Sequence, residues 1–226
     1  MAILTAQKLK KYYGKDPNTV RALDGVDVEV NAGEFVAVVG MSGSGKSTLL
    51  HLLGGLDRPT DGTVIVDGQE LYKMTDEQLT IFRRRNVGFV FQSFNLVPIL
   101  SVYENIVLPI ELDGSTADKP FVDKIICTLG LSDKRDAMPN QLSGGQQQRV
   151  AIARALATKP FIILADEPKG NLDSKTSQDV LGVLKTTSTQ FHQTIMMITH
   201  NEHIAQLADR VIHIEDGKIK REAGRK

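Results

Sequence analysis

Cysteine is almost absent from this sequence of 226 residues, since Cys127 is the only one. A single thiol excludes any disulfide within the chain and fits a reducing compartment. The fold must therefore be stabilised by a hydrophobic core, and a composition of 41% hydrophobic residues supplies one. Cys127 follows two isoleucines, and we expect it to pack there as a small apolar residue rather than act as a reactive thiol.

Net charge is absent as well, because 27 Lys and Arg residues balance 27 Asp and Glu residues. No overall field draws the chain to a polyanion, which argues against a nucleic-acid partner. The sequence also lacks the ~18 consecutive apolar residues of a membrane span. Residues 1–11 lack the apolar core of a signal peptide. We therefore expect a cytoplasmic protein that acts on a membrane only through a separate partner, and we expect residues 217–226 to form a solvated basic tail.

Strand-like segments rich in β-branched residues recur along the chain and predict an α/β fold. They cover residues 2–9, 26–30, 35–39, 63–66, 87–91, 161–165, 194–198 and 210–215. The fully apolar segments are typical of central parallel strands, whereas turns around residues 63–66 favour a small antiparallel β layer. Strand signals disappear between residues 94 and 140, where Ser101 and Glu104 have the spacing of a helix capping box. The sequence therefore predicts a helical lobe inserted into one discontinuous α/β domain.

A glycine-rich stretch at residues 40–47, GMSGSGKS, matches G-x-x-x-x-G-K-[ST] directly after an apolar segment. Its glycines let successive backbone N–H groups point inward, and a helix that starts near Lys46 adds the positive end of its dipole. Lys46 can reach the β- and γ-phosphates, while the Ser47 hydroxyl can ligate Mg²⁺. We therefore predict a nucleoside triphosphate site. Its candidate residues are Gly40, Ser42, Gly43, Ser44, Gly45, Lys46, Ser47 and Thr48.

Two acidic residues, Asp166 and Glu167, end the apolar segment at residues 161–165. The end of a strand beside a phosphate loop is where Mg²⁺ needs a carboxylate, and Asp166 fits that role. Glu167 then fits the general base that orients and polarises the attacking water.

The stretch LSGGQ at residues 142–146 predicts the start of a helix, because Ser143 and Gln146 have capping-box spacing. Gly144 and Gly145 expose backbone N–H groups there, so that a phosphate of another molecule can approach closely. Together with the phosphate loop and the acidic pair, this stretch resembles the ATP-binding-cassette family. The run QLSGGQQQRVAIARAL at residues 141–156 is highly specific to that family, and the resemblance covers essentially the whole chain.

The resemblance implies roles for further residues. Gln92 is similar to the Q-loop glutamine that senses Mg²⁺ and the attacking water, and Asp173 lies in a stretch that resembles the D-loop. His200 resembles the switch histidine that contacts the γ-phosphate. Tyr13 is similar to the aromatic residue that stacks on adenine, with Tyr12 as the alternative.

The family fold implied by the resemblance is a P-loop NTPase (RecA-like) core with a small antiparallel β layer and an inserted helical subdomain. We expect the core at about residues 1–92 and 147–226, and the helical subdomain with the signature stretch at about residues 93–146. Two such domains meet head to tail in the family, so that Ser143 to Gln146 of one copy close on ATP held by Lys46 of the other. The implied activity is ATP hydrolysis that drives a membrane permease.

Other strings resemble the bacterial subgroup of lipoprotein-releasing, macrolide-efflux, antimicrobial-peptide-resistance and cell-division ATPases. Two functions stay open at this stage, transport of a cargo and transmission of a mechanical signal to cell-wall or sensor partners. Residues 94–100 are a candidate groove for a permease helix, or equally core of the helical lobe. Lys169 departs from the subgroup, where threonine is usual, and either extends into solvent or perturbs Glu167.

Overall fold

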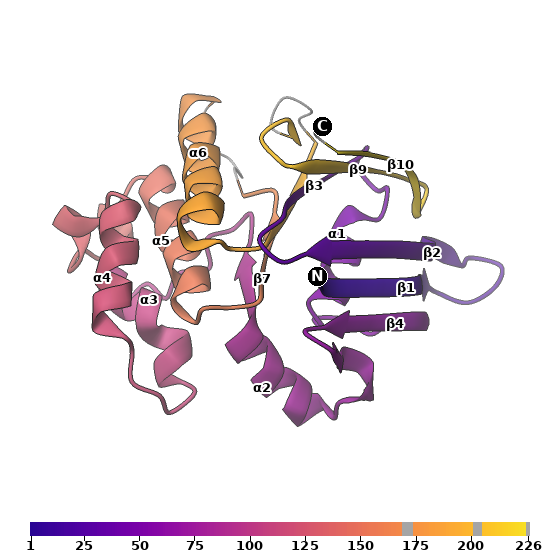
Figure 1. Ribbon diagram of the computed structural model, residues 1–226, viewed down its shortest axis with the longest axis horizontal. Coiled ribbons are helices and arrows are strands. Elements are labelled where there is room, and N and C mark those ends of the chain that lie inside the picture. Colours follow the sequence, from indigo (N-terminus) through magenta and orange to yellow (C-terminus); the bar gives the residue numbers. More distant parts are fainter. Residues whose placement is uncertain (169–173, 201–204, 225–226) are drawn as a thin grey trace.

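The computed structural model describes residues 1–168, 174–200 and 205–224. A six-stranded sheet with the strand order β10-β9-β3-β8-β7-β6 forms its centre (Figure 1). The strands are β3 (Phe35–Val39), β6 (Val87–Val90), β7 (Ile162–Asp166), β8 (Ile195–Thr199), β9 (Arg210–Glu215) and β10 (Lys218–Gly224). All of them run parallel except β10, which pairs antiparallel with β9 at one edge.

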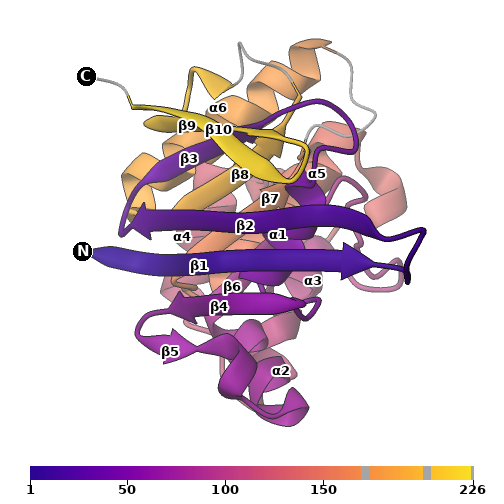
Figure 2. The same ribbon diagram turned by 90° about the vertical axis from the view of Figure 1, so that its right-hand side faces the viewer.

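A second sheet, of four antiparallel strands in the order β2-β1-β4-β5, faces the viewer in Figure 2. Its strands are β1 (Ala2–Tyr13), β2 (Val20–Asn31), β4 (Asp61–Val66) and β5 (Gln69–Glu70). Helix α1 (Lys46–Leu53) lies between the two sheets, because its leucines pack in one buried cluster with residues of β1, β2, β4 and β3.

Helices cover the other face of the six-stranded sheet (Figure 1, left). They are α3 (Val102–Glu111), α4 (Lys119–Thr128), α5 (Gly144–Ala157) and α6 (Ser174–Phe191), whereas α2 (Asp76–Asn86) precedes β6. Short 3₁₀ turns occupy Leu71–Lys73, Ser132–Lys134 and Pro139–Gln141. Alternation along β3 serves both faces of the sheet, since Val36 and Val38 join the cluster around α1 while Phe35, Ala37 and Val39 join the cluster under the helices.

Most of the predicted elements are found near their expected positions. Each of the eight predicted strand segments overlaps an observed strand, and both expected capping boxes form, with Ser101 and Ser143 as the capping residues. Residues 94–140 contain helices and turns but no strand. Among the helices of the described residues, none has both the length and the hydropathy that crossing a membrane requires.

Two expectations about the surface were wrong. The C-terminal segment is not a solvated tail, because residues 218–224 form β10. The turn before it is Asp216-Gly217, with φ of 48° and 70°, which is the strongest short hairpin signal in a sequence. Cys127 is exposed on α4, because the helix turns the isoleucines before it into the core and leaves residue 127 outside.

Candidate functional site

The phosphate loop connects β3 to α1 in a conformation that requires glycine. Gly43 and Gly45 have left-handed φ values of 80° and 101°. A β-carbon on Gly45 would lie 2.2 Å from the carbonyl oxygen of Ala22, and one on Gly40 would lie 2.2 Å from that of Ile214. The loop is therefore enclosed by neighbouring backbone, which leaves no room for a side chain at either glycine.

Lys46 turns back onto its own loop. Its ammonium group donates to the carbonyl oxygens of Gly40 at 2.9 Å and Met41 at 2.6 Å, and the residue is only 6% exposed. These two neutral acceptors satisfy the buried charge without a carboxylate. A phosphate oxygen is a stronger partner than either carbonyl, because the hydrogen bond is then assisted by charge on both sides.

A cavity of about 520 Å³ opens beside the loop. It is lined by the predicted phosphate-binding residues Ser42, Gly43, Gly45, Lys46, Ser47 and Thr48, and by Glu167. Gly40 and Ser44 do not line it but shape the loop from behind, where the Ser44 carbonyl accepts from the Gly217 N–H at 3.1 Å. The remaining lining residues were not predicted from the sequence, and they are Val20, Arg21, Ala22, Asp216 and Gly217. They come from β2 and the β9–β10 turn, far from the motif along the chain.

Ser47 and Asp166 are in contact at the N-terminus of α1. The Ser47 hydroxyl donates to Asp166 Oδ1 at 3.2 Å across a sequence separation of 119 residues. Burial raises the pKa of the Asp166 carboxyl above its ordinary value, and the hydrogen bond from Ser47 partly opposes that rise. A hydroxyl and a carboxylate oxygen at this separation are the oxygen donors that Mg²⁺ takes from a protein.

Glu167 and His200 form a second pair, at the ends of the neighbouring strands β7 and β8. Glu167 Oε2 lies 3.2 Å from His200 Nδ1. The Glu167 backbone has a φ of 43° and its N–H donates to the carbonyl oxygen of Ile198 at 3.2 Å. This left-handed turn directs the carboxylate into the cavity, which Glu167 lines and His200 does not.

Gln92 follows β6 after one residue and is exposed, at the edge of the sheet where β7 ends with Asp166. It does not line the cavity. The chain beyond it is fixed from two sides, because Arg154 donates to the carbonyl oxygens of Phe94 and Asn95 at 3.0 and 2.7 Å. The fully buried Asn105 adds bonds to the backbone of residues 97–101.

The two tyrosines at the end of β1 lie in different surroundings. The Tyr13 hydroxyl donates to Asp57 at 3.0 Å and Lys11 Nζ lies 4.9 Å from its ring centre. The Tyr12 hydroxyl bonds Asp24, and the Arg21 guanidinium lies 5.4 Å from its ring. Neither ring lines the cavity, so the choice of adenine platform stays a prediction.

The signature residues lie apart from this cavity, at the N-terminus of α5. Ser143 Oγ accepts from the Gln146 N–H at 3.3 Å, and Gln146 Oε1 accepts from the Ser143 N–H at 2.9 Å. Ser143 is exposed, Gly144 and Gln146 are partly exposed and Gly145 is buried. None of these residues lines the cavity that holds Lys46. Asp173, of the D-loop prediction, and Lys169 lie outside the described residues.

A separate groove of about 340 Å³ lies between α2, β6, α3 and α5. Its apolar lining includes Leu56, Val87, Phe89, Phe91, Pro109 and Ala155, and its basic lining includes Arg83, Arg84 and Arg154. Arg83 and Arg154 bond only carbonyl and hydroxyl oxygens within the described ranges. The sequence gave no signal of this groove, because Arg83 and Arg154 lie on separate helices. The segment that the sequence suggested as a groove, residues 94–100, does not line it.

Comparison with known proteins identifies the family. The profile of the ABC transporter family matches residues 23–170. The chain is 42% identical to the bacitracin export ATP-binding protein BceA of Halalkalibacterium halodurans, over 97% of this chain and 87% of that protein. It is 43% identical to the macrolide export ATP-binding/permease protein MacB of Syntrophobacter fumaroxidans over 99% of this chain, but it spans only 32% of that relative's length.

The fold has the same relatives. The dimeric post-hydrolysis structure of the ATP-binding cassette MJ0796 of Methanocaldococcus jannaschii, bound to ADP and Pi, superposes with a TM-score of 0.86. The two chains are 40% identical, and the match covers 98% of each. Sequence profile, relatives and fold agree with the motifs of the cavity, and the chain belongs to the ABC transporter family as one of its ATP-binding cassettes.

Proposed function

We propose that this chain is the ATP-hydrolysing subunit of a membrane transporter. The observation that carries the proposal is the contact of Ser47 with Asp166, because it joins the phosphate loop to the strand end that also presents Glu167 to the cavity. Hydrolysis of a nucleoside triphosphate needs a metal-binding hydroxyl and carboxylate and a second carboxylate as base, and Ser47, Asp166 and Glu167 supply these groups around one phosphate loop.

The loop residues and Lys46 bind the triphosphate. Backbone N–H groups of Gly43 and Gly45 face the phosphates, and Lys46 exchanges its two carbonyl partners for the β- and γ-phosphate oxygens. Ser47, Asp166 and Gln92 are the proposed Mg²⁺ ligands, and the ion would neutralise charge that develops on the phosphates.

Glu167 is the proposed general base. Its carboxylate lines the cavity, where it can accept a proton from the attacking water as that water approaches the γ-phosphate. His200 holds this carboxylate at 3.2 Å, and on ATP binding it would turn to the γ-phosphate. The resting pair therefore keeps the base occupied until the substrate arrives.

A second copy of the chain completes the site in this proposal. Ser143, Gly144, Gly145 and Gln146 lie outside the cavity of their own chain, and they are free to cover the ATP of a partner. The dimeric structures of MJ0796 support this arrangement. The resemblance of its stretch to the D-loop assigns Asp173 to ATP binding as well. Hydrolysis removes the γ-phosphate between the two copies, so the pair reopens.

The permease is the proposed partner at the groove beside Phe91. The apolar residues of the groove suit the apolar face of a helix. The positive charges of Arg83 and Arg154 favour a docking segment that carries a carboxylate. Residues 1–92 and 147–226 would move as the core and residues 93–146 as the helical subdomain, at the cytoplasmic face of the membrane. BceA and MacB are named for the export of bacitracin and macrolides, which favours export over signal transmission.

Copurification tests the permease assignment. Leu56 lines the groove and is 43% exposed, whereas Leu96 packs against the core and does not line it, so Leu56→Glu is the variant that tests the groove. We expect Leu56→Glu to fold, to hydrolyse ATP alone and to lose stimulation by the permease partner. Undiminished copurification and stimulation would refute the docking surface.

A further inference from the structure

Helix α1 reaches from the nucleotide cavity to the groove. Its first residues, Lys46 and Ser47, line the cavity, while Leu56, just beyond its last turn, lines the groove. Eight residues at the rise of an α-helix span about 12 Å. One short helix therefore has an end in each of the two sites.

The turn after α1 is fastened to the helix. The N–H groups of Gly54, Gly55 and Leu56 donate to carbonyl oxygens of the last helical turns at 3.0, 3.1 and 2.8 Å. The four leucines of α1 are at most 1% exposed. A close-packed interior has no free volume to absorb a displacement, so movement at the first turn of α1 carries residues 54–56 with it.

Gly54 touches the wall of the groove directly. A β-carbon on Gly54 would lie 2.2 Å from Cζ of Phe89, so the ring rests on the glycine backbone. Phe89 stacks in parallel on Phe91, with ring centres 5.5 Å apart, and both rings line the groove. Phe91 is followed by Gln92. A shift of Gly54 therefore reaches both the groove and the residue proposed to sense Mg²⁺.

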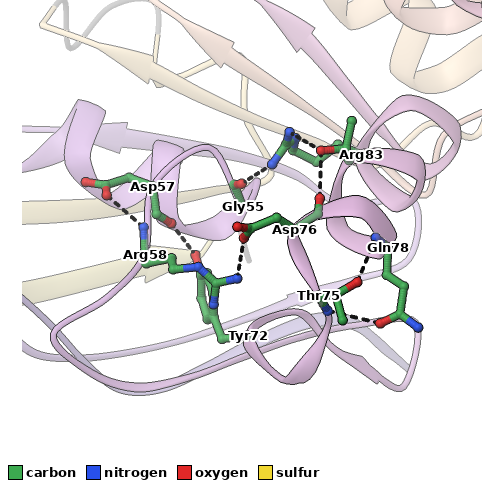
Figure 3. Close-up of polar contacts among 9 residues, drawn as sticks. Gly55, Asp57, Arg58, Tyr72, Thr75, Asp76, Gln78 and Arg83 are labelled. Carbon is green, nitrogen blue, oxygen red and sulfur yellow. Dashed lines mark hydrogen bonds and ion pairs between the residues drawn. The ribbon is translucent and has the colours of Figure 1, made fainter.

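Arg83 makes the second contact (Figure 3). Its guanidinium donates to the Gly55 carbonyl oxygen at 2.6 Å and to Thr80 Oγ1 at 3.1 Å, and it lines the groove. Its neighbours Arg84 and Arg85 both pair with Asp113, whereas Arg83 pairs with no carboxylate in the part of the chain that the structure describes. The Arg83 charge instead stands at the negative end of the α1 dipole.

We propose that α1 is a mechanical link between the nucleotide and the groove, with Arg83 as its positioning residue. Nucleotide binding draws Lys46 away from its loop carbonyls and moves the helix, and residues 54–56 then shift Phe89 and Arg83 within the groove. By thermodynamic linkage, an occupant of the groove changes nucleotide affinity through the same helix. This inference rests on the proposed nucleotide site and permease groove.

A single tryptophan in the groove tests the link, because the chain contains none. Leu56 is 43% exposed, so we expect the fold to accommodate tryptophan at this position. We expect the emission of Leu56→Trp to change on titration with a non-hydrolysable ATP analogue and Mg²⁺, with the midpoint found by equilibrium dialysis. Adding Arg83→Met should reduce the amplitude at saturation at least twofold, and Arg83→Lys, which can still donate to Gly55, should restore most of it.

Arg85→Met is the matched control, since Arg85 lies on the same helix but does not line this groove. It should leave the amplitude unchanged. Constant emission in a chain that binds the analogue by dialysis would overturn the link while leaving the proposed function intact. Equal amplitudes for Arg83→Met and Arg85→Met would overturn the role of Arg83. Absence of binding by dialysis would overturn both proposals. Circular dichroism confirms that each variant is folded.

Discussion

Replacement of Gly54 by alanine should destabilise the fold through contacts alone. The Gly54 backbone has φ of −94° and ψ of 1°, which alanine adopts without strain. The added methyl group, however, would lie 2.2 and 2.7 Å from two ring carbons of Phe89 and 2.8 Å from Cδ1 of Leu164. Carbon atoms in contact are separated by about 3.5–4.0 Å, so all three approaches are too close.

The expected loss is a difference of two terms. Overpacking of a core costs about 1–3 kcal/mol, whereas loss of glycine freedom in the unfolded chain returns about 0.4–1 kcal/mol. Three close approaches at one site place the cost in the upper part of its range, so the net loss should be about 1–2.5 kcal/mol. At about 2–4 °C per kcal/mol for a chain of this size, it lowers Tm by about 2–10 °C. Urea unfolding should show a lower midpoint with an unchanged slope.

Gly182→Ala is the matched control, because Gly182 lies within α6 with nothing inside 4 Å of an added β-carbon. It should stabilise the chain by about 0.5–1 kcal/mol. The double variant Gly54→Ala with Phe89→Leu should be less destabilised than the sum of the single variants, since leucine lacks the colliding ring atoms. A Gly54→Ala chain as stable as Gly182→Ala, or strictly additive single variants, would refute the reasoning.

Three further predictions concern the nucleotide site. Glu167→Gln should bind ATP, lose about 10²–10⁴-fold in hydrolysis and elute as a dimer with ATP and Mg²⁺; a monomeric, fully active variant would contradict the base and the composite site together. Tyr13→Ala should weaken ATP binding by about 1–3 kcal/mol in calorimetry, the usual worth of base stacking, and a larger loss in Tyr12→Ala would transfer the adenine to that ring. Asp166→Asn should stabilise the nucleotide-free chain in EDTA at neutral pH, because burial raises the pKa of Asp166 and disfavours its charged form. That gain should disappear as the pH falls below the ordinary carboxyl range, and a variant less stable than the parent at neutral pH would contradict it.

Local patterns in the sequence predicted much of the fold. The phosphate loop, the capping boxes of α3 and α5 and the apolar strands depend on neighbouring residues, and these elements formed where expected. The hairpin turn at Asp216-Gly217 was equally local, so β10 could have been predicted from it. The charged residues of β10 had suggested a solvated tail, because apolar and polar residues alternate only weakly along this edge strand.

Contacts between distant segments that belong to no motif were beyond prediction from a single sequence. Arg21 and Asp216 line the nucleotide cavity, yet neither belongs to a motif. Arg83 also belongs to no motif, and in the structure its guanidinium donates to the carbonyl oxygen of Gly55, just after the end of α1. The positions of Arg21, Asp216 and Arg83 depend on how β2, β9 and α2 pack, which the spacing of residues along the chain does not reveal.

The position of the signature residues outside their own cavity has a genetic consequence. In the dimer proposed above, each active site would take Lys46 from one chain and Ser143 from the other. A chain altered at Lys46 and a chain altered at Ser143 are then both inactive alone, but a mixed pair contains one site with both residues intact. Coexpression of two dead alleles should therefore restore part of the activity, whereas two alleles altered at the same residue should never complement each other.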